Sequence, residues 1–334
     1  MYTAAVIGCG RAGFLYDLDK KRKEIFTHIG GYRSNKKISK IIAVDKNKGS
    51  LKKIKEVYPD IQVFESAKDL FSEEKVDILS VATPTGPRLD IIMLAIQNGV
   101  KAIFCEKPIA EDTEEANKIL SICKNHDVIL AVNHFRRWDN LHIVMSNMIK
   151  SKKIGDVQNI VVKYNKGILN TGSHIFDLIS MVFGKIYQVR CIGVAKNCKK
   201  DPTLHVHGKT DSGIDFFLIG SDHEHFRMFE FEILGTSGRI VNDNGYLCKM
   251  QGIEDSINNS EFKVLSDPDS SKIVGGRSGH YENAVSDIIF CIENNESQIS
   301  CSGIDGVRSL LASLSSINSY RNESSVELLD SFLV

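Results

Sequence analysis

The chain has 334 residues, of which 42% are hydrophobic and 25% are charged, and its 42 Lys and Arg residues balance its 42 Asp and Glu residues. A chain of this length is expected to form two domains, and this composition is typical of a globular protein with a sizeable core. The neutral balance of charge gives no indication of binding to nucleic acid or to an anionic membrane. No apolar run approaches the roughly 18 residues that a membrane-spanning helix needs.

The N-terminal segment and the cysteines bear on the compartment. The start MYTAAVIGCG has too short an apolar run for a secretory signal peptide. The eight cysteines are scattered and form no C-x-x-C pair, which favours reduced thiols over a zinc site or a disulfide framework. We therefore expect a cytoplasmic protein without a metal.

In the first part of the chain, short apolar runs alternate with amphipathic segments, which is typical of a parallel sheet wound with helices. Helices are predicted in between, for example over residues 87–99 and over residues 111–124, where Asp112 and Glu115 resemble a capping box. These elements fill residues 1–134 and predict an α/β Rossmann dinucleotide-binding domain. The predicted strands are AAVIG, KIIAVD, IQVF, DILSVAT, AIFCE and VILAVN.

From Val157 onward, strand-like runs follow one another with little helix between them. In RMFEFEIL the side chains alternate between apolar and polar, which indicates a sheet with one buried and one wetter face. Residues 135–334 are therefore predicted to form an α+β domain with a large, mostly antiparallel open sheet, for substrate binding and oligomerisation. Two helices are predicted at 280–295 and 303–320, of which the second could return to the first domain. The polar segment 253–279 is expected to be a loop.

The sequence GCGRAG, residues 8–13, carries a G-x-G-x-x-G motif after a predicted strand and before a predicted helix. Gly8 would make the tight turn, Gly10 would let a pyrophosphate approach the backbone, and Gly13 would let helix and strand pack closely. The amides at the helix start, with Arg11 and Ala12 in the loop, would bind the phosphates.

Asp45 ends the second predicted strand, where a carboxylate can accept bonds from ribose hydroxyls and repel a 2′-phosphate. This position favours NAD, although Lys46 and Lys48 could tolerate the phosphate of NADP. Asp45 lies farther from the glycines than the usual ~20 residues, because the segment YDLDKKRKEIFT is inserted near the first helix. The alternative is that Asp45 is a turn residue at the end of the strand.

Lys107 directly follows the fifth predicted strand, and ligands of open α/β sheets lie at the carboxyl ends of strands. Its ammonium could hold a substrate hydroxyl and ease deprotonation of that group. The alternative is a solvated surface lysine, as most lysines are.

The stretch GILNTGSHIFD places Asn170, His174 and Asp177 at spacing i, i+4 and i+7. If the helix extends back to Asn170, these three side chains share one stripe. This stripe is a candidate active site.

Five motifs occur in the order and spacing of the Gfo/Idh/MocA oxidoreductases, a family that includes glucose-fructose oxidoreductase and inositol dehydrogenase. The chain resembles this family over nearly its whole length, including the tail segments FEFEILGTSGRI, YENAVSDII and GIDGVRSLLA. The five motifs are GCGRAG, ATPT (82–85), EKP (106–108), NHFRR (133–137) and GSHIFD (172–177).

The resemblance implies that Lys107 is a catalytic or substrate-orienting lysine, in a Lys107–Pro108 bond that is cis in relatives. It implies that His174 is the general acid/base, a role that suits an imidazole titrating near neutrality. Other residues that the resemblance places around the cofactor and substrate are Ala82, Thr83, Pro84, Glu106, Asn133, His134, Arg136 and Arg137.

Asn170 departs from the family, because many of its sugar and cyclitol dehydrogenases have an aspartate at this position. An amide can bind a substrate hydroxyl but cannot act as a base, so His174 and Lys107 would carry proton transfer between them. Asp177 is interpreted mainly as a residue that orients the helix or backbone beside His174.

Some polar side chains keep two interpretations. Lys163 and Lys166, with Tyr164, could contact an anionic substrate or could form a solvated strand end. Two H-x-H pairs on strand-like runs could line a sugar pocket on the open sheet face, and their spacing gives little support to a metal. The pairs are His205 with His207, and His223 with His225.

Together these features predict an NAD(P)-dependent oxidoreductase that moves hydride between nicotinamide and a hydroxyl-bearing carbon of a sugar, cyclitol or nucleotide-sugar. Two alternatives remain: an enzyme that oxidises its substrate transiently to epimerise it or cleave a glycosidic bond, and a non-catalytic nucleotide sensor. A homodimer or homotetramer is expected by analogy.

Overall fold

The computed structural model describes residues 1–243, 247–256, 261–266, 272–276, 278–295 and 297–329. The chain divides into two compact units. The first unit comprises Met1–Trp138 and Gly279–Val307, and the second comprises Asp139–Ser278 and the residues from Arg308 onward. The helix at 280–293 thus joins the first unit, although it follows the second unit's strands in the sequence.

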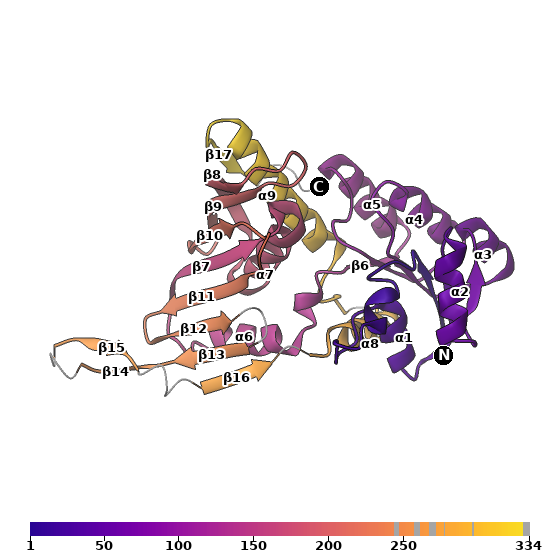
Figure 1. Ribbon diagram of the computed structural model, residues 1–334, viewed down its shortest axis with the longest axis horizontal. Coiled ribbons are helices and arrows are strands. Elements are labelled where there is room, and N and C mark those ends of the chain that lie inside the picture. The colour runs from indigo at the N-terminus through magenta and orange to yellow at the C-terminus, as the bar shows by residue number, and fades with distance from the viewer. Residues whose placement is uncertain (244–246, 257–260, 267–271, 277, 296, 330–334) are drawn as a thin grey trace. The chain divides into compact units, whose positions relative to one another are not determined.

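The first unit is built on a six-stranded parallel sheet with the strand order β3-β2-β1-β4-β5-β6 (Figure 1). This order is that of the Rossmann fold, so the predicted fold of this unit is confirmed. All residues of β4 and β5 are buried, as expected for central parallel strands. The strands are β1 (Tyr2–Ile7), β2 (Ile38–Val44), β3 (Gln62–Phe64), β4 (Ile78–Val81), β5 (Ala102–Cys105) and β6 (Ile129–Val132).

Helices connect these strands, and α4 packs beside α5 while α1 packs beside α8. The predicted start of α5 is confirmed, because the Asp112 side chain accepts a 2.8 Å hydrogen bond from the amide of Glu115. The helices are α1 (His28–Ser34), α2 (Lys48–Val57), α3 (Ala67–Glu73), α4 (Arg88–Gln97), α5 (Thr113–Asn125) and α8 (His280–Glu293), with 3-10 turns at Leu15–Leu18 and Phe135–Arg137.

The first helix is interrupted by an insertion. The glycine loop leads into the 3-10 turn Leu15–Leu18, and α1 begins only at His28, so the prediction of a helix directly after the loop is wrong. The amide of His28 bonds the carbonyl of Ala12 at 3.0 Å, and the amide of Ile29 bonds that of Gly13 at 3.2 Å. These bonds continue the helical pattern across the insertion, which therefore loops out without displacing the helix from the sheet.

The second unit contains a sheet with nine strands among the described residues, in the order β16-β13-β12-β11-β7-β10-β9-β8-β17 (Figure 1). Neighbours pair antiparallel except β7 and β10, so the predicted open, mostly antiparallel sheet is confirmed. The strands are β7 (Val157–Asn165), β8 (Ile186–Lys196), β9 (Thr203–Thr210), β10 (Asp215–Ser221), β11 (Phe229–Gly235), β12 (Gly238–Asp243), β13 (Leu247–Gln251), β16 (Lys272–Gly276) and β17 (Val326–Leu328).

One face of this sheet carries the core. Side chains of α6 (Asn140–Lys150), α7 (Ser173–Phe183) and α9 (Gly303–Arg321) pack against the strands in one buried cluster. Phe229, Phe231 and Ile233 point into this cluster, whereas Glu230 and Glu232 are partly exposed, as the alternation in RMFEFEIL predicts. The opposite face exposes apolar side chains such as Ile192 and Ile219.

The segment 253–279, which we expected to be a loop, contains strands. β14 (Ile253–Asp255) pairs with β15 (Lys263–Leu265), and β16 pairs with β13 at the edge of the large sheet. The pairing of β16 is long-range, so local composition does not reveal it; residues 257–260, 267–271 and 277 lie outside the described residues. Over the part of the chain that the structure describes, every helix is too short or too polar to cross a membrane.

Candidate functional site

In the glycine loop, each glycine meets a different spatial requirement. Gly8 has a φ of 96°, and a Cβ there would lie 2.7 Å from the carbonyl group of Ala82. A Cβ on Gly13 would collide with the carbonyl oxygen of Gly8. A Cβ on Gly10, in contrast, would meet no protein atom within 4 Å. The loop is therefore tightly packed at Gly8 and Gly13 and open at Gly10, which fits a close approach of phosphate to the backbone.

Asp45 follows β2 and contacts the glycine loop directly. Its carboxylate accepts a 2.7 Å bond from the amide of Cys9 and a 2.8 Å bond from the amide of Asn47. The bond from Asn47 is typical of a turn residue, whereas the bond from Cys9 ties Asp45 to the glycine loop. Lys48 forms a 2.8 Å ion pair with Glu65. Burial, and secondly the Asp45 charge, raise the pKa of the Cys9 thiol to about 12, so this thiol is neutral.

Arg88 is a buried cation that our sequence analysis did not identify. It is 3% exposed, and its guanidinium donates to the carbonyl oxygen of Thr83 at 2.7 Å and to those of Glu106 and Pro108. It thereby links the loop after β4, which contains Pro84, to the loop after β5, which contains Lys107. The available signal was its position at the first turn of α4, directly after Pro87 in PTGPR.

Glu106 is anchored by side chains from distant parts of the first unit. Its Oε1 accepts a 2.7 Å bond from Asn133 and lies 3.3 Å from Nε2 of His28, while Asn133 also donates to Tyr281 at 2.9 Å. Burial acts to raise the pKa of Glu106, but the bonds from His28 and Asn133 and the charge of Lys107 outweigh it, so the pKa is lowered. Glu106 is therefore ionised at neutral pH, and it fixes the strand end directly before Lys107.

Lys107 is half-buried, and the Lys107–Pro108 peptide bond is cis, as the family resemblance implies. His134 is buried; burial first, and then the charges of Lys107, Arg137 and Arg136, lower its pKa well below the ordinary value. It is therefore a neutral imidazole at pH 7.

The two arginines of NHFRR lie in different surroundings. Arg136 is buried with its guanidinium 4.6 Å from the ring centroid of Phe135. Arg137 donates to the carbonyl oxygen of Ser300 at 2.9 Å and pairs with Asp305 at 3.0 Å. Arg137 therefore holds the start of α9, and nothing in this geometry singles it out as a substrate ligand.

In the second unit, the helix does extend back to Asn170. Residues Gly167–Gly172 form a π-helix that continues directly into α7, so Asn170, His174 and Asp177 lie on one continuous helical segment. His174 is 9% exposed and Asp177 is 1% exposed. Short π-helical stretches are rare in proteins, and those that occur often lie at functional sites. The structure thus brings these three predicted residues together.

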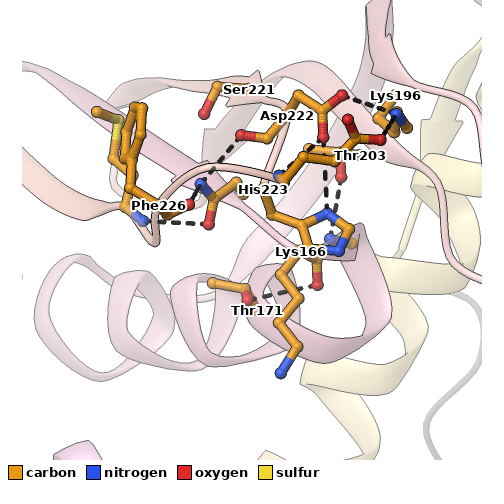
Figure 2. A network of polar contacts seen from close by, with 12 residues as sticks. Lys166, Thr171, Lys196, Thr203, Ser221, Asp222, His223 and Phe226 are labelled. Carbon is orange, nitrogen blue, oxygen red and sulfur yellow. Dashed lines mark hydrogen bonds and ion pairs between the residues drawn. The ribbon is translucent and has the colours of Figure 1, made fainter.

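A polar network surrounds the start of this segment (Figure 2). Lys196 pairs with Asp222 at 2.7 Å and with Glu224 at 2.5 Å, and the hydroxyl of Thr171 donates to the carbonyl oxygen of Lys166 at 3.5 Å. In Figure 2 the side chain of Lys166 extends away from Asp222. The ion pairs of Lys196 thus tie the end of β8 to the segment that follows β10.

Several predicted residues lie elsewhere on the second unit. Lys163 is exposed on the open face of the sheet, while its neighbour Tyr164 is buried on the face that α7 covers. His205 and His207 are on the open face too, where His207 pairs with Asp215 at 2.6 Å and stacks on Phe217. The structure does not bring Lys163 or these histidines to His174. Among the described residues, no three His, Cys, Asp or Glu side chains form a group that could hold a metal ion.

Residues 2–134 match the Gfo/Idh/MocA family model, which describes an oxidoreductase family with an NAD-binding Rossmann fold. The chain is 25% identical over 223 residues to scyllo-inositol 2-dehydrogenase (NADP(+)) IolW of Bacillus subtilis (strain 168), covering 61% of this chain and 57% of the relative. It is 23% identical over 349 residues to scyllo-inositol 2-dehydrogenase (NAD(+)) of the same organism, covering 97% of this chain and 95% of the relative. The chain spans about half the length of the first curated relatives that it matches.

Among solved structures, an oxidoreductase from Agrobacterium radiobacter in complex with NAD+, L-tartaric acid and magnesium has a TM-score of 0.78 at 16% identity, covering 98% of both chains. The fold and its glycine loop thus define the class of proteins with a dinucleotide-binding Rossmann domain. Together with the match of residues 2–134, they support a Gfo/Idh/MocA family oxidoreductase and confirm the resemblance predicted from the motifs.

Proposed function

We propose that the chain is an NAD(P)-dependent dehydrogenase or reductase that acts on a hydroxyl-bearing carbon of a cyclitol or sugar. The observation that carries this proposal is the continuous helical segment formed by the π-helix and α7. Asn170 lies in the π-helix, and His174 lies one turn later in α7. This segment occurs in a chain whose glycine loop has the packing of a dinucleotide site. A nucleotide-binding fold without turnover would not require such a histidine.

In the first unit, the proposed cofactor contacts lie at the carboxyl ends of the parallel strands. The open backbone at Gly10, with Arg11 and Ala12, would hold the pyrophosphate, and Asp45 would accept bonds from a ribose. The loops fixed by Arg88 and Glu106 would hold the nicotinamide end, through Ala82, Thr83, Pro84 and Asn133. A bound nicotinamide would supply the hydride acceptor or donor.

Lys107 would donate a hydrogen bond to the reacting oxygen of the substrate. An ammonium at this oxygen stabilises the negative charge that develops when the hydroxyl is deprotonated, or when a carbonyl is reduced. Glu106, ionised and held by the side chains of His28 and Asn133, keeps the backbone of Lys107 in place without competing for the substrate.

In the second unit, His174 would take the hydroxyl proton during oxidation and return it during reduction. Asn170 would bind a neighbouring hydroxyl, because its amide can donate and accept but cannot take up a proton. Asp177, buried one turn after His174, would orient the helix and the imidazole. This leaves proton transfer to His174 and charge stabilisation to Lys107.

We propose NAD as the cofactor, with NADP as the alternative. The carboxylate of Asp45 lies beside the glycine loop, where its charge would repel a 2′-phosphate. Two of its hydrogen-bonding sites are used by the amides of Cys9 and Asn47, which leaves further lone pairs for ribose hydroxyls.

A cyclitol is the first substrate to test, because both relatives described above are scyllo-inositol dehydrogenases. The second candidate is an enzyme that uses bound NAD transiently for epimerisation or glycoside cleavage, or a sensor without turnover. Asn170 favours the sensor, since the base that many family dehydrogenases have at this position is missing.

The deciding experiment has two parts. Mass spectrometry of small molecules released by denaturing fresh protein should detect NAD(H), and scyllo-inositol or a related polyol with NAD+ should raise the absorbance at 340 nm. Tightly retained NAD without net absorbance change would favour transient oxidation. Binding of NADH without turnover of any polyol, sugar or nucleotide-sugar would contradict the proposed dehydrogenase.

We further propose that the protein is a cytoplasmic homo-oligomer. The open face of the large sheet exposes Ile192, Val194 and Ile219, which a second copy of the chain could cover. Sedimentation at micromolar concentration should give a dimer or tetramer, and a monomer would contradict this proposal.

A further inference from the structure

The start of the helical segment that carries Asn170 and His174 is bonded to one short stretch of chain. A helix start leaves its first amides without partners inside the helix. Here residues 201–203 accept from four consecutive amides, so none of the four is left for a substrate anion. The bonds run from Gly167 N to Thr203 Oγ1 (3.0 Å), Ile168 N to the Pro202 carbonyl (2.9 Å), Leu169 N to Asp201 Oδ1 (2.7 Å) and Asn170 N to Asp201 Oδ2 (3.1 Å).

The backbone at this point is unusual as well. Lys166 is left-handed, with a φ of 70° and a ψ of 44°, and Gly167 has a φ of 84°. A Cβ on Gly167 would collide with the Asp201 carboxylate, so the chain approaches this side chain as closely as glycine allows. Conformations of this kind persist where the surroundings fix them, and they cluster at functional sites.

The chain before this turn is fixed independently. Asn165, the last residue of β7, is 2% exposed. Its side-chain amide donates to the carbonyl oxygen of Phe226 at 2.8 Å, and its Oδ1 accepts from the backbone amide of Met228 at 3.1 Å. With β7 held by Asn165, the direction in which the helix leaves the sheet is set by residues 201–203.

We infer that Asp201 is a positioning residue for the reaction, an inference that rests on the proposed function. Its two carboxylate oxygens fix the amides of Leu169 and Asn170, and therefore fix where the Asn170 side chain and His174, one turn later, point. Its negative charge also lies at the start of the π-helix Gly167–Gly172, at the N-terminal end of the helical segment, where it is favourable. Asp201 touches no reacting atom in this scheme and acts only through the segment that it holds.

The test compares Asp201→Asn and Asp201→Ala with Asp112→Asn. Asp112 caps α5 in the first unit in the same way, through the amide of Glu115, and is the matched control. Because a misplacement of about 1 Å can cost about 100-fold in rate, we expect kcat to fall about 10-fold in Asp201→Asn and about 100-fold in Asp201→Ala. The Kd for NADH, which reports on the first unit, should stay within about twofold in all variants.

The rate of hydrogen exchange at the amides of residues 167–170 measures whether these amides keep their bonds to residues 201–203. It should accelerate in both Asp201 variants and stay unchanged in Asp112→Asn, which should also keep the wild-type kcat. Faster exchange with wild-type kcat and KM would overturn the inference and leave the proposed function intact. Unchanged exchange in Asp201→Ala would overturn it as well. If the wild-type chain turned over no substrate, the proposed function would fail, while the exchange would still decide whether Asp201 holds the turn.

Discussion

The imidazole of His28 lies 3.3 Å from the carboxylate of Glu106, although 78 residues separate them in the sequence. His28 is fully buried, and its other ring nitrogen lies 2.8 Å from the hydroxyl of Ser80. The first residue of α1, directly after the insertion, therefore holds the strand end that precedes Lys107. This contact connects the interrupted first helix to the proposed active site.

Replacing His28 with Ala should destabilise the protein by about 2–4 kcal/mol at pH 7, because a partly buried carboxylate loses a donor and the removal of a fully buried imidazole leaves a cavity. The pKa of Glu106 is lowered in the folded state, with burial opposing and His28 favouring this shift. The stabilisation by His28 is thus complete above the unfolded pKa of about 4.3 and is lost as pH falls through the lower folded pKa. Urea unfolding of wild type and variant between pH 3 and 7 measures this loss.

His126→Ala is the matched control, because His126 is exposed at the end of α5, where its Nδ1 lies 2.9 Å from the backbone carbonyl oxygen of Ile122. It should change stability by less than about 0.5 kcal/mol. A His28→Ala effect that is the same at pH 3 and pH 7 would show that the imidazole does not act through Glu106.

The presence of both sheets and most of their strands could be predicted from the sequence, because these strands have a local signature; the edge strand β16, in a segment expected to be a loop, has none. The parallel strands are short apolar runs, and β11 alternates between buried and exposed residues. The position of α8 in the first unit could not be predicted, since it depends on packing against α1, more than 200 residues earlier. The start of α1 after the insertion could not be predicted either. It depends on hydrogen bonds such as the one from the amide of Ile29 to the carbonyl oxygen of Gly13, which no local sequence pattern reveals.

The glycine loop offers a pair of variants that separates packing from ligand binding. Gly13→Ala would force a Cβ against the Gly8 carbonyl oxygen, whereas Gly10→Ala would add a methyl group in open space. We expect Gly13→Ala to lower the stability by about 2–4 kcal/mol and to abolish NADH binding. Gly10→Ala should keep the melting temperature and weaken NADH binding at least about 10-fold, because the methyl group would block the pyrophosphate.

Thermal unfolding and NADH fluorescence titration measure both effects. If Gly10→Ala bound NADH as tightly as the wild type, the phosphates would not approach the loop at Gly10. The assignment of the glycine motif to the cofactor would then be wrong, whatever the stability of Gly13→Ala.

Asp45→Asn tests the preference between cofactors. The amide keeps one oxygen, which can still accept from Cys9 or Asn47, but it loses the negative charge that repels a 2′-phosphate. The ratio of Kd values for NADPH and NADH should therefore fall about 10-fold or more, mainly through tighter NADPH binding. An unchanged ratio would mean that Asp45 is a turn residue only, and Lys46→Ala would then show whether that lysine selects the cofactor.

The proposed site could only partly be predicted from the sequence, because motifs indicate the side chains proposed to react and not the groups that hold them. Lys107, Asn170 and His174 are found from spacing and strand ends. Arg88 and Asp201 act through contacts with backbone carbonyls and amides, which depend on where loops return in three dimensions. Neither residue lies in one of the five motifs, so the structure is needed to show what each of them holds.

His174→Ala should lower kcat by about 100- to 10,000-fold, the usual contribution of a general acid/base, and leave the Kd for NADH within about twofold. Turnover at 340 nm and a fluorescence titration measure the two quantities. His207→Ala is the control, because His207 pairs with Asp215 on the open face of the sheet and should retain the wild-type rate. Equal loss in both variants would indicate damage to the second unit as a whole. Wild-type turnover in His174→Ala would remove the histidine from the mechanism and leave Lys107 as the group to test next.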